Sequence, residues 1–132
     1  ITTLDSQTGN FTRADGKTVM EGFLQKYGSD IDLVYAHNDD MALGAIDAIE
    51  AAGLVPGTDI QIVSIDAVKD GMLALIDGKI NFIVECSPLL GDQLFQASSA
   101  VLAGQSIPAR IVTVEGSFDQ QQAIAALPTR QY

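Results

Sequence analysis

The feature that most constrains the fold is an alternation between short apolar runs and longer segments whose apolar residues recur at helical spacing. The pattern predicts strands at 1–5, 31–36, 60–66, 82–86 and 111–114, and helices at 14–27, 39–52, 69–76, 88–103 and 119–126. Strands that alternate with helices favour a parallel sheet with right-handed crossovers. We therefore expect an α/β fold, a doubly wound parallel sheet with helices on both faces in three layers.

The composition is that of a folded domain with an acidic surface. The 132 residues are 47% hydrophobic and 18% charged, which supplies enough apolar material for one core. The formal net charge of −10 argues against binding to nucleic acid and against adsorption to anionic membranes, because both attract a surplus of lysine and arginine. No apolar run approaches the roughly 18 residues that a membrane-spanning helix needs, so we also expect no insertion into a bilayer.

Polar side chains gather where the expected strands end. Asn38 follows the second strand, Asp66 ends the third, Glu85 and Cys86 end the fourth, and Phe11 lies just beyond the first. In an open α/β sheet, ligands bind outside the carboxyl ends of the strands. Carboxylates accept hydrogen bonds from hydroxyl groups, an amide both donates and accepts, and an aromatic ring packs on C–H groups. This set of side chains is therefore suited to a polyhydroxyl ligand.

Each of these residues also has a purely structural interpretation. Asn38 stands where a helix N-cap belongs, and Asp66 can cap the helix that follows it. Phe11 can simply pack within its loop. Glu85 and Cys86 are neighbours on one strand, so at most one of them faces the ligand edge unless the strand bulges.

The sequence offers little for catalysis. His37 is the only histidine and Cys86 the only cysteine, which excludes metal sites built from several imidazoles or thiolates. There is no Gly-x-Ser-x-Gly elbow and no phosphate-binding glycine loop. Asp39 and Asp40 suit a helix N-terminus better than a catalytic pair, and Cys86 is expected to be a buried structural thiol. We expect a protein that is not an enzyme and that uses no cofactor or metal.

Residues 34–44 resemble the segment shared by periplasmic sugar-binding proteins of the ribose-binding type. Three later pieces fit in the same order: the strand-ending aspartate at 65–66, the turn at 78–80 and the helix opening at 88–91. The chain is most similar to the galactofuranose-binding branch, at 6–13, 36–40, 84–88 and 127–132. The resemblance covers essentially the whole chain.

The resemblance implies one Rossmann-like lobe of a two-lobe periplasmic protein that serves an ABC sugar importer. The two lobes would close on a monosaccharide, galactofuranose or a related sugar, and the closed form would dock on the membrane permease. Asn38 and Asp66 match positions that hydrogen-bond the sugar hydroxyls, and Phe11 matches one that packs on the sugar ring. Cys86 stands where ribose-type relatives carry a sugar-binding glutamine, and Glu85 is expected to replace it through a bulge.

The resemblance also implies that this chain is a fragment, incomplete at its N-terminal side. Residues 1–115 correspond to a partial C-terminal lobe, and residues 116–132 to the crossover and terminal helix. The N-terminal lobe is missing, as are the first strand and helix of this lobe. We therefore expect either that residues 1–5 shift inward to pair with 33–36, or that another chain fills the gap. Half a cleft is expected to bind sugar weakly.

A second class of protein uses the same two-lobe fold. Lac-repressor-like transcription regulators employ it as an effector-binding module behind a DNA-binding headpiece. Upstream sequence discriminates between the two classes, because a signal peptide indicates transport and a helix-turn-helix indicates regulation.

Overall fold

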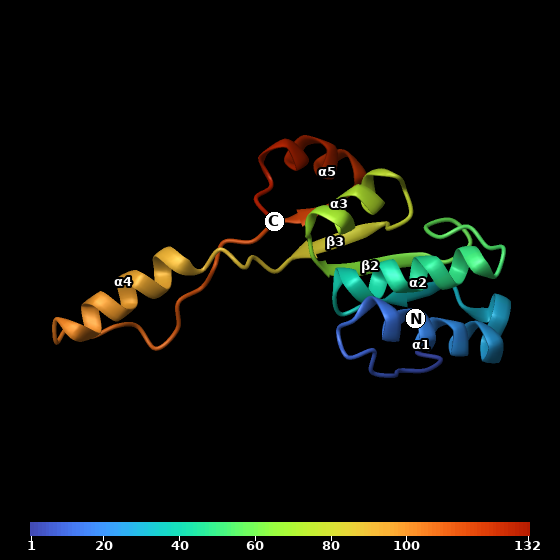
Figure 1. The fold of residues 1–132 in the computed structure, drawn as a ribbon, viewed down its shortest axis with the longest axis horizontal. Helices are drawn as coiled ribbons and strands as arrows, with labels where there is room; N and C mark the ends of the chain where they lie inside the picture. Colours follow the sequence, from blue (N-terminus) through green and yellow to red (C-terminus); the bar gives the residue numbers. More distant parts are fainter.

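The computed structural model describes all 132 residues, which form an α/β body and a long projecting arm (Figure 1). In chain order the elements are α1 (Arg13–Tyr27), the 3-10 turn η1 (Gly28–Asp30), β1 (Leu33–Tyr35), α2 (Asp39–Ala51), β2 (Gln61–Asp66), α3 (Lys69–Ile76), β3 (Phe82–Glu85), α4 (Gly91–Leu102), β4 (Ser117–Phe118), α5 (Gln120–Ala126) and the 3-10 turn η2 (Leu127–Thr129). All the expected helices and the three central strands are confirmed, with small differences at their ends.

Local signals set the ends of the helices. α1 begins after Thr12, whose hydroxyl accepts a hydrogen bond from the backbone amide of Asp15. It ends at Gly28, where a φ of 53° favours glycine. α5 begins with a capping box in which Asp119 and Gln122 each accept the other's backbone N–H. The caps at Thr12 and Asp119 satisfy N–H donors that a helix start otherwise leaves unpaired, and the N–H of Gly28 donates to the carbonyl of Leu24 at the end of α1.

The sheet contains four strands in the order β1-β2-β3-β4. The first three are parallel, with Tyr35 opposite Val63 and Asp66 opposite Glu85. Their carboxyl ends therefore lie along one edge of the sheet, as the sequence predicted. β4 is antiparallel to β3. The expected α/β class is confirmed, with two differences from the expected arrangement: this antiparallel strand and the uncovered sheet face described below.

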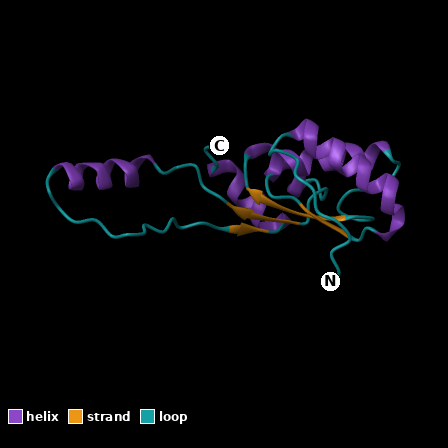
Figure 2. Ribbon diagram, turned by 90° about the horizontal axis from the view of Figure 1, so that it is seen from below, coloured by secondary structure: helices purple, strands orange, loops and turns teal.

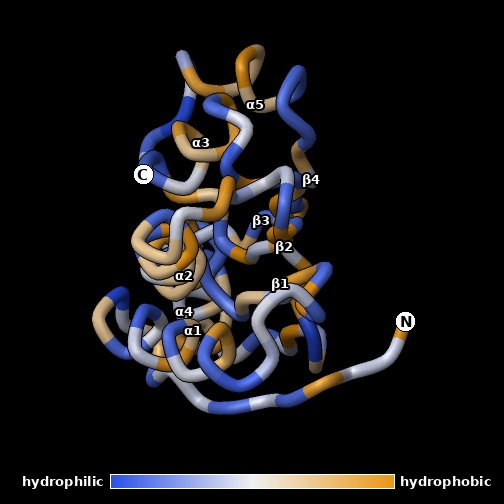
Figure 3. Tube along the Cα trace, turned by 90° about the vertical axis from the view of Figure 1, so that its right-hand side faces the viewer, coloured by the Kyte–Doolittle hydropathy of each residue, from blue (hydrophilic) through white to orange (hydrophobic).

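Two of the expected strands are wrong. Residues 1–5 have no regular structure and run past the body without joining the sheet (Figure 3), so they do not pair with β1. Residues 111–114 also lie outside any strand, and the last strand is Ser117–Phe118 instead. A strand needs a neighbour for its backbone hydrogen bonds, and neither of these runs has one in this chain. The outer edge of β1 is consequently free.

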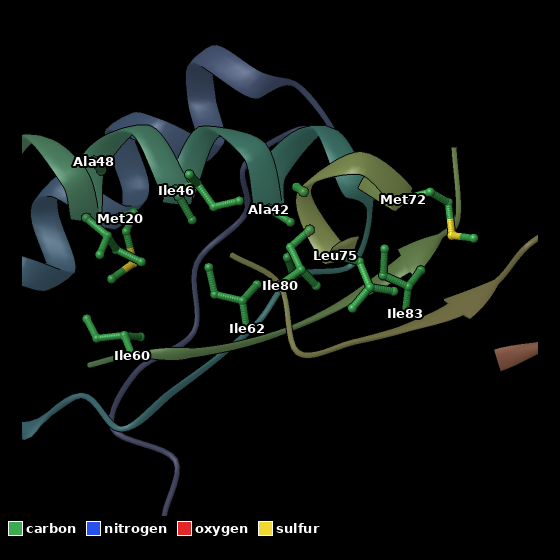
Figure 4. Close-up of a cluster of buried hydrophobic side chains, with 14 of the residues drawn as sticks. Met20, Ala42, Ile46, Ala48, Ile60, Ile62, Met72, Leu75, Ile80 and Ile83 are labelled. Atoms are coloured by element: carbon green, nitrogen blue, oxygen red, sulfur yellow. The ribbon is translucent and has the colours of Figure 1, made fainter. Parts of the chain in front are cut away.

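The core lies between one face of the sheet and the helices of the body. Its largest fully buried aliphatic side chains come from α1, α2, β2, α3, the turn before β3 and β3 itself: Met20, Ile49, Ile62, Met72, Leu75, Ile80 and Ile83. Figure 4 shows several of them between the strands and helices α2 and α3. Against this layer α1 packs closely on α2, because Gly44 leaves room for the backbone of Arg13.

The other face of the sheet is open in this chain. Side chains alternate between the two faces along a strand, and those turned away from the core include Leu33, Tyr35 and Val84. They are 42%, 56% and 39% exposed, respectively. The sheet therefore presents an uncovered apolar face to solvent.

Residues 87–116, here called the arm, leave the body after β3 and return to it at β4 (Figures 1 and 2). The arm carries α4, in which no residue is buried. Its apolar residues Leu94, Phe95 and Leu102 are 68%, 74% and 89% exposed. The expected division at 115/116 falls where the arm rejoins the body. None of the helices, α4 included, has the length and hydropathy needed to cross a membrane.

Candidate ligand-binding edge

The carboxyl ends of β1, β2 and β3 bring the predicted binding residues to one edge of the body. Asn38 follows β1, Asp66 is the last residue of β2 and Glu85 is the last residue of β3. Phe11 reaches the same edge from the loop before α1, where its carbonyl accepts a 3.1 Å hydrogen bond from the amide of Asn38. The structure thus assembles all four predicted residues, but it gives them different surroundings.

Asn38 caps α2 and also links two loops. Its Oδ1 accepts a 2.9 Å hydrogen bond from the backbone N–H of Met41, which is the N-cap interaction. Its Nδ2 donates to Phe11, as described above. The side chain is half-buried, and the amide holds two more hydrogen-bonding sites than these contacts use. A capping role and a ligand contact are therefore compatible at this residue.

Asp66 occupies an unusual backbone conformation next to Asn38. Its φ is 115° and that of Ala67 is 64°, both in the region that favours glycine. The carboxyl is half-buried. Burial raises the pKa of Asp66, the backbone amide of Asp39 opposes this shift, and the nearby carboxylate of Asp40 adds to it. Non-glycine residues in this region cluster at ligand-binding sites, where the surrounding structure holds them in place.

Phe11 shares this kind of backbone. Its φ is 58° and that of Asn10 is 49°, in a turn closed by a 3.0 Å hydrogen bond from the backbone N–H of Thr12 to the carbonyl of Gly9. The ring of Phe11 is 65% exposed, so loop packing does not account for it. An exposed aromatic ring, in a loop that is hydrogen-bonded to the amide of Asn38, is a surface on which a sugar ring can stack.

Glu85 is occupied by partners within the chain. Its Oε1 accepts hydrogen bonds from Arg130, at 2.6 Å, and from the hydroxyl of Tyr132, and its Oε2 accepts from the backbone of Gly116. Burial raises the pKa of Glu85, but the hydrogen bonds from Tyr132, Gly116 and Arg130 outweigh burial and lower the pKa below its usual value. These contacts favour a structural role for Glu85 over the predicted ligand contact.

Cys86 differs from its expected state. Its thiol is exposed rather than buried, because β3 ends at Glu85 and the chain leaves the body there. Its backbone N–H donates a 3.2 Å hydrogen bond to the carbonyl of Asp66. His37 is also exposed, and its ring lies 5.0 Å from that of Tyr35. No group of three or more histidine, cysteine or acidic side chains is placed to hold a metal ion.

Two features of this edge were missed by the sequence reasoning. Asp39 is a buried residue, only 1% exposed, whose carboxylate accepts hydrogen bonds from Ser64, at 2.6 Å, and from the backbone of Val68, at 2.8 Å. Burial, which these bonds offset only in part, raises the pKa of Asp39 to about 6. A signal was present, since Ser64 is a polar residue at an inward-facing position of an apolar strand. The second feature is Arg130, which donates to Glu85, and no pattern in the sequence indicated this contact.

Comparison with known proteins identifies the kind of chain that carries this edge. Residues 1–106 match the family described as periplasmic binding protein domains. The chain is 42% identical over 120 residues to the galactofuranose-binding protein YtfQ of Escherichia coli. The aligned region covers 89% of this chain and 38% of the relative. It is 36% identical to the fructose import binding protein FruE of Bifidobacterium longum, across 100% of this chain and 41% of the relative.

The solved structures that are similar to this chain are also those of sugar-binding proteins. A Mycobacterium smegmatis protein in complex with β-D-fucofuranose is 60% identical, with a TM-score of 0.93 over 98% of this chain and 42% of that one. An arabinose-transporter binding protein from Shewanella, bound to L-arabinofuranose, is 48% identical with a TM-score of 0.88, over 97% of this chain and 43% of that one. The chain spans about two fifths of the length of the proteins it matches. It therefore corresponds to one lobe of a type I periplasmic binding protein.

Proposed function

Because this chain belongs to the family of periplasmic binding protein domains, we propose that the longer protein to which it corresponds is a sugar receptor of an ABC importer. Such a receptor works in the periplasm, binds one monosaccharide between two lobes and delivers it to a membrane permease. It performs no chemical reaction. The observation that carries the proposal is the edge itself, where the half-buried side chains of Asn38 and Asp66 follow neighbouring parallel strands and the exposed Phe11 is joined to Asn38 through its carbonyl.

The proposed ligand is a furanose, galactofuranose or a related sugar. Asn38 offers unused donor and acceptor sites, and the half-buried carboxylate of Asp66 accepts hydrogen bonds from sugar hydroxyls. Phe11 supplies an exposed ring for the C–H face of the sugar. Similar proteins with bound fucofuranose and arabinofuranose support this ligand class.

The arm supports the two-lobe arrangement. Residues before it and residues after it build one body, whereas α4 stands apart with its apolar side chains in solvent. Exposed apolar residues on a helix indicate a missing packing partner. We propose that the second lobe provides this partner, and that the arm forms two of the connections between the lobes.

The test is a thermal-shift screen of the complete receptor against a panel of furanose and pyranose sugars. A ligand that binds only the folded state adds about 2.7 kcal/mol of stability at a hundredfold excess over its Kd. We expect a rise in Tm with one or a few furanoses, which Asn38→Ala and Asp66→Ala each reduce by about half or more. Asp32→Ala is the matched control, because Asp32 is an exposed aspartate that precedes β1 at the opposite end of the strand. If no sugar raises the Tm of the wild type, the proposal is wrong.

A further inference from the structure

Arg130 lies behind the proposed ligand edge, in a segment that follows α5 and η2. Its side chain is 10% exposed, and its guanidinium lies 5.3 Å from the ring centre of Phe118 and 4.3 Å from that of Tyr132. Its Nε is buried without a hydrogen-bond partner. A buried unpaired donor is unfavourable, so the other contacts of the guanidinium must hold the side chain in this position.

One of those contacts joins Arg130 to the base of the arm. Its Nη1 donates a 2.6 Å hydrogen bond to Glu85, the last residue before the arm departs. Glu85 in turn binds Gly116, where the arm returns: its Oε2 accepts from the N–H of Gly116 at 2.8 Å, and its own N–H donates to the carbonyl of Gly116 at 2.9 Å. The Arg130–Glu85 pair thus fixes the place where both connecting segments of the arm meet the body.

The other contact joins Arg130 to the loop that carries Asp66. Its Nη2 donates a 2.5 Å hydrogen bond to the carbonyl of Ala67, which has a φ of 64°. The neighbouring backbone groups are held as well: the carbonyl of Asp66 by the N–H of Cys86, and the N–H of Val68 by Asp39. A strained conformation of this kind persists only where the surroundings fix it, and Arg130 supplies the one charged donor among these contacts.

We propose that Arg130 is a positioning residue for sugar binding. It holds the strained backbone of Asp66 and Ala67 at a fixed position relative to the base of the arm. One guanidinium connects the loop that presents Asp66 to the point from which the arm extends toward the second lobe. A movement of the arm that shifts Glu85 therefore also shifts the carbonyl of Ala67, and with it Asp66. This inference rests on the sugar-receptor function proposed above.

The test uses the complete receptor and measures the Kd for the sugar and the Tm of the unliganded protein in parallel. Arg130→Lys keeps a positive charge for Glu85, but a single ammonium group cannot reproduce the fork that reaches Glu85 and Ala67 together. We expect its Kd to rise about tenfold while its Tm stays near that of the wild type. Lys26→Met is the matched control, because Lys26 forms an exposed ion pair with Asp5 on another part of the body. Its Kd is expected to be unchanged.

A second variant separates positioning from folding. Arg130→Met leaves Glu85 buried without its cation, which lowers Tm for reasons unrelated to the sugar. In the double variant Arg130→Met with Glu85→Gln the lone charge is gone, so we expect Tm to recover and Kd to remain raised.

Recovery of both quantities in the double variant, or a wild-type Kd in Arg130→Lys, overturns the positioning role while leaving the receptor function intact. A wild type that binds no sugar overturns the receptor function and this inference together.

Discussion

The hydroxyl of Ser64 donates a 2.6 Å hydrogen bond to the carboxyl group of Asp39, and both residues are buried. This contact joins the start of α2 to the middle of β2, and the second carboxyl oxygen of Asp39 extends it to the backbone of Val68 before α3. Three elements that frame the ligand edge thus meet at one acidic side chain. Its protonation state therefore affects the stability of the body.

The stability of the body is expected to rise in mild acid through Asp39. Its pKa is about 6 in the folded chain against 3.8 in the unfolded chain, so the folded state binds more protons between these values. The contribution is fully present below pH 4 and is lost as the pH rises through 6, a difference of ~3 kcal/mol. Thermal unfolding of the wild type and of Asp39→Asn from pH 4.5 to 7.5 measures it. The Tm of the wild type should increase relative to that of the variant as the pH falls; a constant difference indicates an ordinary pKa.

Substitutions at Asn38 separate its capping role from its proposed ligand role. Asn38→Ala removes the cap of α2 and should lower the free energy of unfolding by about 1 kcal/mol. Asn38→Ser restores the cap, because a hydroxyl can accept from the N–H of Met41, and should recover most of this loss. Neither variant keeps the amide, so both should bind sugar at least about tenfold more weakly, a loss of ~1.4 kcal/mol. Recovery of sugar affinity in the serine variant would assign Asn38 to capping alone.

The close packing of α1 on α2 should make one glycine irreplaceable and leave another free. A Cβ on Gly44 would overlap the backbone of Arg13 and Lys17, so Gly44→Ala should cost 1–3 kcal/mol, about the range for overpacking. Gly22 lies within α1 with no atom near its Cβ position, and Gly22→Ala should stabilise the helix by about 0.5–1 kcal/mol. Urea denaturation of both variants provides the comparison. Equal effects would contradict the close approach of the two helices.

The open face of the sheet should make the isolated chain self-associate. Tyr35 and Val84 are exposed apolar residues on that face, and the outer edge of β1 is unpaired. Tyr35→Lys and Val84→Lys should shift the chain toward the monomer in light scattering without lowering its Tm. Gln25→Lys is the control, since it adds the same charge at an exposed position of α1, on the covered side of the sheet. Equal self-association in all these variants would locate the contact elsewhere, for example on α4.

Periodicity and capping residues predicted most of the body from sequence. The helix at 39–51 carries a clear apolar face and a cap at Asn38, and β2 and β3 are apolar runs with polar ends. Residues 1–5 and 111–114 look equally like strands, but they do not become strands here because pairing depends on a neighbour and not on the run itself. Local sequence therefore indicated which segments can form strands, and the tertiary contacts decided which of them do.

The position of the candidate edge was predicted from the sequence, but the hydrogen bonds and backbone angles of its residues were not. Strand ends placed Phe11, Asn38, Asp66 and Glu85 on one edge by topology alone. The carboxylate of Glu85 is hydrogen-bonded to Arg130, which is 45 residues away in the sequence, and no local sequence pattern indicates such a contact. Positive φ values at Asp66 and Ala67 were likewise invisible, since neither residue is glycine.

The route of the chain through the arm has a consequence for synthesis. β4 and α5 complete the body, with Phe118 packed against the core and Ala123 fully buried in it, yet both follow the arm in the sequence. A ribosome must therefore deliver the whole arm before the last pieces of the core arrive. Until then the nascent body has an unfilled site beside α3 and β3, and it is during this interval that a chaperone has the most apolar surface to bind.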